Sequence, residues 1–250
     1  MHNMKSRSGL LISIGAMALV VAVVGVVLSW SAGSGVMAAP AQSEDGLAGY
    51  APPARSLAET LPASTCTLVG STRTCELWAK SGVITMPTGV EVPIWGFADA
   101  ADVPAQLPGP AIIANSGETL TVVLHNALPA ETVSLYFGGQ SLLPDLTGVA
   151  SGGDVTYTFP LADPGTFIYE AGLTENGGRQ VAMGLYGGLI VRPLATGTQA
   201  YDDVATAYDD EALLILSELD PAFNNDPYNF RMEHFVPKYW LINGQAYPDI

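Results

Sequence analysis

The sequence predicts an all-β protein whose main body is an antiparallel sandwich or barrel. Between residues 76 and 193, short segments rich in Val, Ile, Thr and aromatic residues follow one another at close spacing. Gly, Pro, Asn and Asp separate these segments, and no stretch of this region sustains the apolar period of a helix. Many short strands at regular intervals are typical of sandwiches and barrels.

Residues 1–39 form a segment of a different kind. After two basic residues, the chain has no charge over 8–42 and is strongly apolar from Gly9 to Trp30. This order is typical of a secretion signal, with cleavage after Ala38, or of an uncleaved membrane-anchor helix, and both interpretations stay open. Either one predicts that the rest of the chain is exported, to the extracellular space or the cell surface.

The charge of the chain restricts its partners. There are 24 Asp and Glu against 9 Lys and Arg, which gives a formal net charge of -15. A phosphate backbone or an anionic lipid surface would repel such a protein. The composition therefore excludes nucleic acid as a partner and leaves membrane contact only to the N-terminal segment.

Residues 40–75 are expected to be a linker that ends in a disulfide loop. The first part is rich in Ala, Pro and Ser without periodicity, and the chain has two cysteines, Cys66 and Cys75. A close pair of cysteines in an exported chain is usually oxidised. A metal site on these thiols is the weaker alternative, because no histidine lies nearby to complete a tetrahedral set.

The strands expected in the main body follow in order along the chain. The segment 117–126 alternates most clearly, which predicts that Leu120, Val122 and Leu124 face the core and that His125 lies on the opposite surface. The same criteria predict strands at residues 76–86, 90–98, 132–137, 154–161, 165–172 and 186–193.

The pattern of residues 165–193 predicts two strands joined by a glycine-rich loop. Gly177 and Gly178 beside Arg179 indicate a turn in that loop, with the arginine as a solvated charge. Three later glycines suit positions of close packing or a bulge: Gly184, Gly187 and Gly188.

The composition changes after this stretch. Residues 196–210 are expected to be an acidic linker in which Tyr-Asp-Asp occurs twice, and a calcium site is the weaker alternative because the spacing matches no recognised calcium loop. Residues 211–250 contain two strand-like segments, 212–223 and 239–248. Two strands do not form a stable sheet alone, so this tail docks on the main body, pairs with another chain or belongs to a domain cut short.

The order of four segments resembles the N-terminal domain of the multicopper oxidases, the laccase and bilirubin-oxidase family. These segments are LPGPAIIANSGETLTVVLHNALP, YFGGQ, PGTFIYEAG and QVAMGLYGGLIVRP, and ELDPAF and KYWLINGQAYPD resemble the start of the family's second domain. The resemblance implies a Greek-key, cupredoxin-like sandwich over 76–195 and an incomplete second cupredoxin-like domain over 211–250. It also implies a copper-dependent oxidoreductase that couples oxidation of a small substrate to oxygen reduction.

The same resemblance assigns four positions to copper-ligating histidines, and none of them is histidine here. Tyr136 and Gly138 stand in YFGG, and Glu170 and Gly172 stand in YEAG. Copper in such a site needs imidazole nitrogens, whereas glycine has no side-chain donor and tyrosine binds well only when deprotonated. We therefore expect this chain to bind no copper and to hold no catalytic residue, with Glu170 a partly solvated strand-end residue rather than a hard-metal ligand.

A mononuclear blue-copper site is excluded on the same grounds. It needs two histidines and a cysteine thiolate, but apart from His2 only His125 and His234 are present, and the cysteines are expected to be oxidised. The sequence also lacks a serine nucleophile elbow, a phosphate loop and a carboxylate pair set across a cleft.

Two hypotheses about function follow. The chain is the N-terminal part of an exported multicopper-oxidase-like protein whose copper lies in other domains, or it is a non-catalytic cupredoxin-like scaffold or binding module. The first predicts further cupredoxin domains as partners, and the second allows a homo-oligomer.

Overall fold

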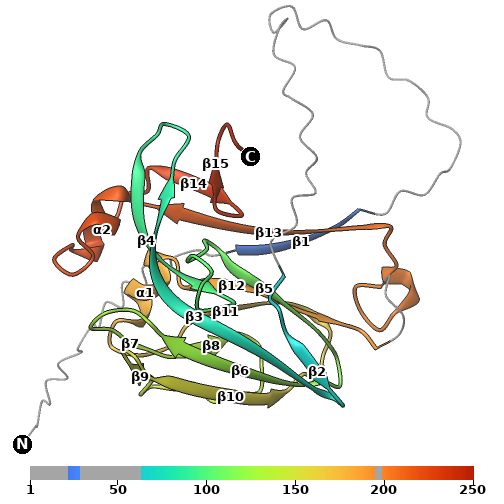
Figure 1. Cartoon of the computed structure of the whole chain (residues 1–250). Helices are drawn as coiled ribbons and strands as arrows, with labels where there is room; N and C mark the ends of the chain where they lie inside the picture. Colours follow the sequence, from blue (N-terminus) through green and yellow to red (C-terminus); the bar gives the residue numbers. More distant parts are fainter. Residues whose placement is uncertain (1–21, 29–62, 195–198) are drawn as a thin grey trace, which may run out of the picture.

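The computed structural model of the protein describes residues 22–28, 63–194 and 199–250 (Figure 1). Two sheets and a small strand pair form the main body. The first sheet has five strands: β2 (Thr67–Val69), β3 (Thr72–Thr85), β4 (Glu91–Ala98), β6 (Thr119–Asn126) and β10 (Asp154–Pro160). The second sheet has four: β5 (Gly109–Asn115), β8 (Leu135–Phe137), β11 (Gly165–Ala171) and β12 (Tyr186–Arg192). The small pair joins β7 (Thr132–Val133) and β9 (Val149–Ala150).

One hydrophobic core lies between the two sheets. Phe137 of β8 packs on Phe159 of β10 with ring centroids 4.8 Å apart, and Tyr169 of β11 packs on Phe97 of β4 at 5.6 Å. Burial alternates along β6, where Leu120, Val122 and Leu124 are fully buried and the residues between them are only partly buried. The predicted all-β sandwich is therefore confirmed.

The direction of pairing differs from the expectation in two places. β3 pairs with β6 in parallel, and β12 pairs with β5 in parallel, whereas an antiparallel sandwich was expected. An alternating pattern records which face of a strand is buried, and it carries no information about the direction of the neighbouring strand.

The glycine-rich loop contains a helix that the sequence pattern did not predict. α1 (Gly177–Met183) replaces the expected turn at Gly177 and Gly178. Its residues Gln180, Val181, Ala182 and Met183 are buried. A seven-residue helix is unstable alone, so tertiary packing rather than local propensity holds it in place.

The expected N-terminal helix is not confirmed. Of that segment, the structure describes residues 22–28, which form β1 (Ala22–Leu28) rather than a helix. This strand pairs antiparallel with β13 (Asp210–Leu219), from Ala22 opposite Leu216 to Leu28 opposite Asp210. The run AVVGVVL is rich in valine, whose branched side chain favours extended backbone. The other residues of the expected leader and linker, 1–21 and 29–62, lie outside the described part.

A search of the described residues for a helix long and apolar enough to cross a membrane finds none.

The tail docks on the main body as a third sheet, with strand order β1-β13-β14-β15 (Figure 1). Its elements are η1 (Val204–Thr206), β13, α2 (Pro221–Asn225), η2 (Met232–His234), β14 (Tyr239–Ile242) and β15 (Gln245–Ala246). Ile215 of β13 is fully buried within the main core. Asn224 of α2 donates from Nδ2 to the Pro93 carbonyl of β4 at 2.9 Å. The first strand expected in the tail, 212–223, thus ends in a helix, because Asp220 caps this helix and Pro221 begins it.

Candidate functional site

The four positions that the resemblance assigns to copper ligands lie together at the ends of two neighbouring strands. Tyr136 of β8 and Glu170 of β11 are direct partners in the antiparallel register. The amide of Gly138 donates to the Ile168 carbonyl at 3.0 Å, and the amide of Gly172 donates to the Ser134 carbonyl at 2.8 Å. The order of motifs in the sequence therefore identifies one continuous patch of sheet.

The side chains in this patch do not fit a copper cluster. It offers one phenol and one carboxyl group, from Tyr136 and Glu170, and no imidazole. Across the part of the chain that the structure describes, no group of three or more His, Cys, Asp or Glu residues is placed to hold a metal ion. A copper cluster built on four histidines needs imidazole nitrogens, so one phenol and one carboxyl group cannot take their place.

Space at the two glycines differs. A Cβ atom added to Gly138 would have its nearest neighbour, Ile168 Cγ2, at an ordinary 3.5 Å. A Cβ atom added to Gly172 would lie 2.3 Å from Ser134 Oγ and 3.2 Å from the Leu135 carbonyl carbon. The sheet therefore has room for a side chain at Gly138 and has no room for one at Gly172.

Glu170 is the one carboxyl group of the patch, and burial raises its pKa. Ionisation of this carboxyl therefore costs more free energy in the folded protein than in the unfolded chain. The sequence placed Glu170 as a partly solvated polar residue, and its burial is intermediate.

We predict that Glu170→Gln stabilises the protein at pH 7, by roughly 0.5–1 kcal/mol. Because the folded-state pKa is raised, the native protein loses stability as pH rises through that pKa, and the amide removes this loss. Urea unfolding at pH 7 and at about pH 4, where the unfolded carboxyl is half protonated, should show the gain shrinking at the lower pH. Glu175→Gln, at an exposed carboxylate of the following loop, is the matched control and should change nothing at either pH. A loss of stability in Glu170→Gln at pH 7 would contradict the prediction.

A buried carboxyl group that the sequence analysis did not single out lies behind α1. Glu131 is 2% exposed, and its Oε2 accepts a hydrogen bond from Gln180 Nε2 at 2.6 Å. The same amide nitrogen donates to the Thr132 carbonyl at 2.9 Å. This network attaches α1 to the start of β7. A single glutamate ahead of a short strand gives no sequence signal of such a role.

The two histidines of the described residues lie in different settings. His125 lies on the outer face of β6, as predicted, but its side chain is only 16% exposed. Its ring stacks on Trp78 at 4.0 Å, and its nitrogens contact Glu76 at 2.7 Å and Asp154 at 2.5 Å. His234 is exposed in η2. Neither belongs to a group of metal-ligating side chains in the described ranges.

Cys66 and Cys75 form the predicted disulfide, which joins the start of β2 to β3. Cys75 is fully buried in the main core. Both thiols are consumed, so the alternative of a metal site on them is not realised.

The predicted close packing of the later glycines is confirmed. A Cβ atom at Gly187 would lie 2.3 Å from the Tyr169 ring, and one at Gly188 would lie 3.0 Å from Leu213. The β5–β12 register shifts between Gly187 and Leu189, which is the expected irregularity.

Comparison with known proteins gives one consistent result. Residues 90–196 match the sequence model of the multicopper oxidase family. The chain is 37% identical over 123 residues to L-ascorbate oxidase of Cucurbita maxima, covering 45% of this chain and 20% of the relative. It is 29% identical over 120 residues to copper resistance protein A of Pseudomonas syringae pv. tomato, covering 45% and 18%. The match thus spans about a fifth of the length of these relatives.

Solved structures support the same fold. The blue copper oxidase of Nitrosomonas europaea superposes with a TM-score of 0.57 at 22% identity, over 71% of this chain and 55% of the other. The copper nitrite reductase of the same organism gives a TM-score of 0.53 at 22% identity, over 70% and 57%. At such identity these likenesses establish the fold alone. Together with the sequence matches, they identify residues 90–196 as a cupredoxin-like domain of the multicopper oxidase family.

Proposed function

We propose that this chain is the N-terminal part of an exported multicopper-oxidase-like protein in which this domain supplies structure and no copper ligands. The observation that carries the proposal is the paired patch on β8 and β11. Tyr136 and Glu170 face each other across the strands where the family resemblance expects histidines. The cupredoxin frame does not depend on these ligands, because its core lies between the sheets.

Export is proposed from two features. The N-terminal 39 residues have the order of a secretion signal or a membrane anchor. The Cys66–Cys75 disulfide is a bond that persists in oxidising compartments. The extracellular space or the cell surface is the location that accounts for both.

Copper and catalysis are proposed for other domains of the whole protein. β13, β14 and β15 would begin a second cupredoxin-like domain, and oxidation of a small substrate with reduction of oxygen would take place on copper held elsewhere. The role of this domain would then be to pack against the copper-bearing domains.

A non-catalytic scaffold or binding module is the second candidate, and one surface favours it. The outer face of the third sheet exposes Trp240 at 65% and Leu216 at 37%. Exposed apolar patches on a sheet mark surfaces that associate with other chains. Homo-oligomerisation is the simplest form of such association.

The copper content of the purified whole chain tests the proposed function. After incubation with copper and removal of loose metal by a chelator, we expect mass spectrometry to find less than about 0.1 copper per chain, because no imidazole cluster is available. The blue copper oxidase of Nitrosomonas europaea, carried through the same procedure, is the control for copper retention. Stoichiometric copper that survives the chelator would contradict the proposal. Loss of that copper in Glu170→Ala or His125→Ala would then show which residue holds it.

A further inference from the structure

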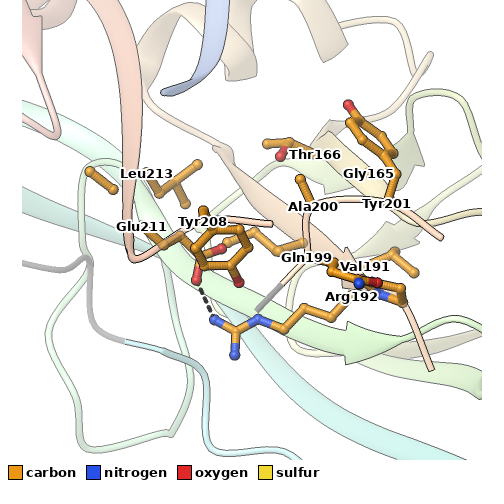
Figure 2. A pocket seen from close by; sticks show the side chains of 13 residues that line it. Gly165, Thr166, Val191, Arg192, Gln199, Ala200, Tyr201, Tyr208, Glu211 and Leu213 are labelled. Atoms are coloured by element: carbon orange, nitrogen blue, oxygen red, sulfur yellow. Dashed lines mark hydrogen bonds and ion pairs between the residues drawn. The ribbon is translucent and has the colours of Figure 1, made fainter. Parts of the chain in front are cut away.

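A cavity lies at the seam between the main body and the third sheet. It has a volume of about 300 Å³ and is lined by the start of β11, the end of β12, the start of β13 and residues of the segment 199–208 (Figure 2). This volume is at the lower end of the range for ligand pockets, which suits a small ligand. None of the residues discussed for copper lines it.

A charged pair forms one side of the cavity. Arg192 of β12 and Glu211 of β13 approach to 2.5 Å, and the dashed line in Figure 2 marks this contact. Both side chains remain about one-third exposed. Arg192 Nε is buried without a hydrogen-bond partner, so the guanidinium keeps a donor that the ion pair does not use. That atom is closed to solvent, so an acceptor oxygen of a ligand would instead bind the N–H groups on the exposed part of the guanidinium.

Aromatic and neutral polar groups form other parts of the lining. Tyr201 and Tyr208 both line the cavity, and Tyr201 is 52% exposed. Thr166 and Gln199 add a hydroxyl and an amide. Aromatic faces with nearby hydrogen-bonding groups suit a ligand that has both an apolar face and polar edges.

The charge around the cavity selects against anions. Glu211 balances Arg192, and four aspartates lie in the adjoining segment: Asp202, Asp203, Asp209 and Asp210. A carboxylate or phosphate would therefore meet a net negative surrounding. An arginine beside a glutamate matches a vicinal diol, because one hydroxyl accepts from the guanidinium while its neighbour donates to the carboxylate.

We infer that this cavity binds a neutral polyhydroxylated ring of the size of one monosaccharide. The ring's hydroxyl edge contacts Arg192 and Glu211, and its C–H face packs against a tyrosine. This site is independent of copper and goes beyond the proposed function.

Ligand-observed NMR titration of the whole chain with glucose, galactose, mannose and xylose tests the inference. We expect at least one sugar to bind saturably in the millimolar range. Arg192→Gln and Glu211→Gln should each weaken that binding about 10-fold or more, because each removes a charge-assisted hydrogen bond. Asp202→Asn, beside the cavity but outside its lining, is the matched control and should leave binding unchanged.

Tyr201→Ala keeps the test decisive if loss of the ion pair harms folding. Its ring is half-exposed, so the fold should tolerate the change, while binding should fall about fivefold. Absence of saturable binding of all four sugars at about 100 mM would overturn the inference. So would equal binding in the wild type and the folded cavity variants. Tighter binding of glucuronate than of glucose would overturn the assignment to neutral ligands.

Discussion

Gly187→Ala is expected to destabilise the protein by more than about 3 kcal/mol, and the variant should be largely unfolded under mild conditions. The added methyl group would lie 2.3 Å from the Tyr169 ring and its hydroxyl oxygen. Tyr169 cannot move aside, because it is fully buried and its hydroxyl donates to the Pro110 carbonyl at 2.6 Å. Interiors packed to crystal density relieve such overlaps only by shifting backbone.

Chemical unfolding followed by tryptophan fluorescence measures the effect. Gly178→Ala is the matched control, because a methyl group there meets nothing within 4 Å. Alanine is also the better helix former, so this change in α1 should be neutral or slightly stabilising. If Gly187→Ala unfolds at the same denaturant concentration as the wild type, the close approach of β12 to Tyr169 is wrong.

Restoring histidines at the two glycine positions is expected to have unequal effects. Gly172→His should cost several kcal/mol, because its Cβ would lie 2.3 Å from Ser134 Oγ within a buried strand pair. Gly138→His should change stability by no more than about 1 kcal/mol, because its Cβ meets only ordinary contacts. Thermal unfolding of both variants makes the comparison directly.

Ser134 provides the control for this comparison. In the background Ser134→Gly, which removes both side-chain atoms that crowd Gly172, the added cost of Gly172→His should fall markedly. Equal costs of the two histidine variants in the wild-type background would show that steric closure does not distinguish the positions. The predicted asymmetry means that substitution of the ligand residues alone would not rebuild a copper cluster here.

Much of the site's location could be predicted from the order of motifs. The resemblance to the family assigns YFGG and YEAG to one site, and β8 and β11, although β9 and β10 lie between them in the chain, pair so that Tyr136 lies opposite Glu170. The disulfide also followed from two close cysteines. The disulfide depends on local information, because its cysteines are nine residues apart, whereas the site depends on the family's order of motifs.

The elements that were missed depend on partners distant in the chain. α1 begins with two glycines, which disfavour a helix, yet Gln180 is anchored on Glu131, 49 residues earlier. β1 follows from its pairing with β13 across almost the whole chain. The cavity unites β11, β12, β13 and the segment 199–208, and no short motif marks the meeting of Arg192 with Glu211.

Alternation of apolar and polar residues was therefore sufficient for the class of fold and for most strands of the main body. One face of such a strand packs on the core and the other faces water, whichever strand it pairs with. It could not decide the parallel pairs, the helix in the loop, the docking of the tail or the cavity. These depend on contacts between distant segments, whose free energy appears only when both sides are already folded.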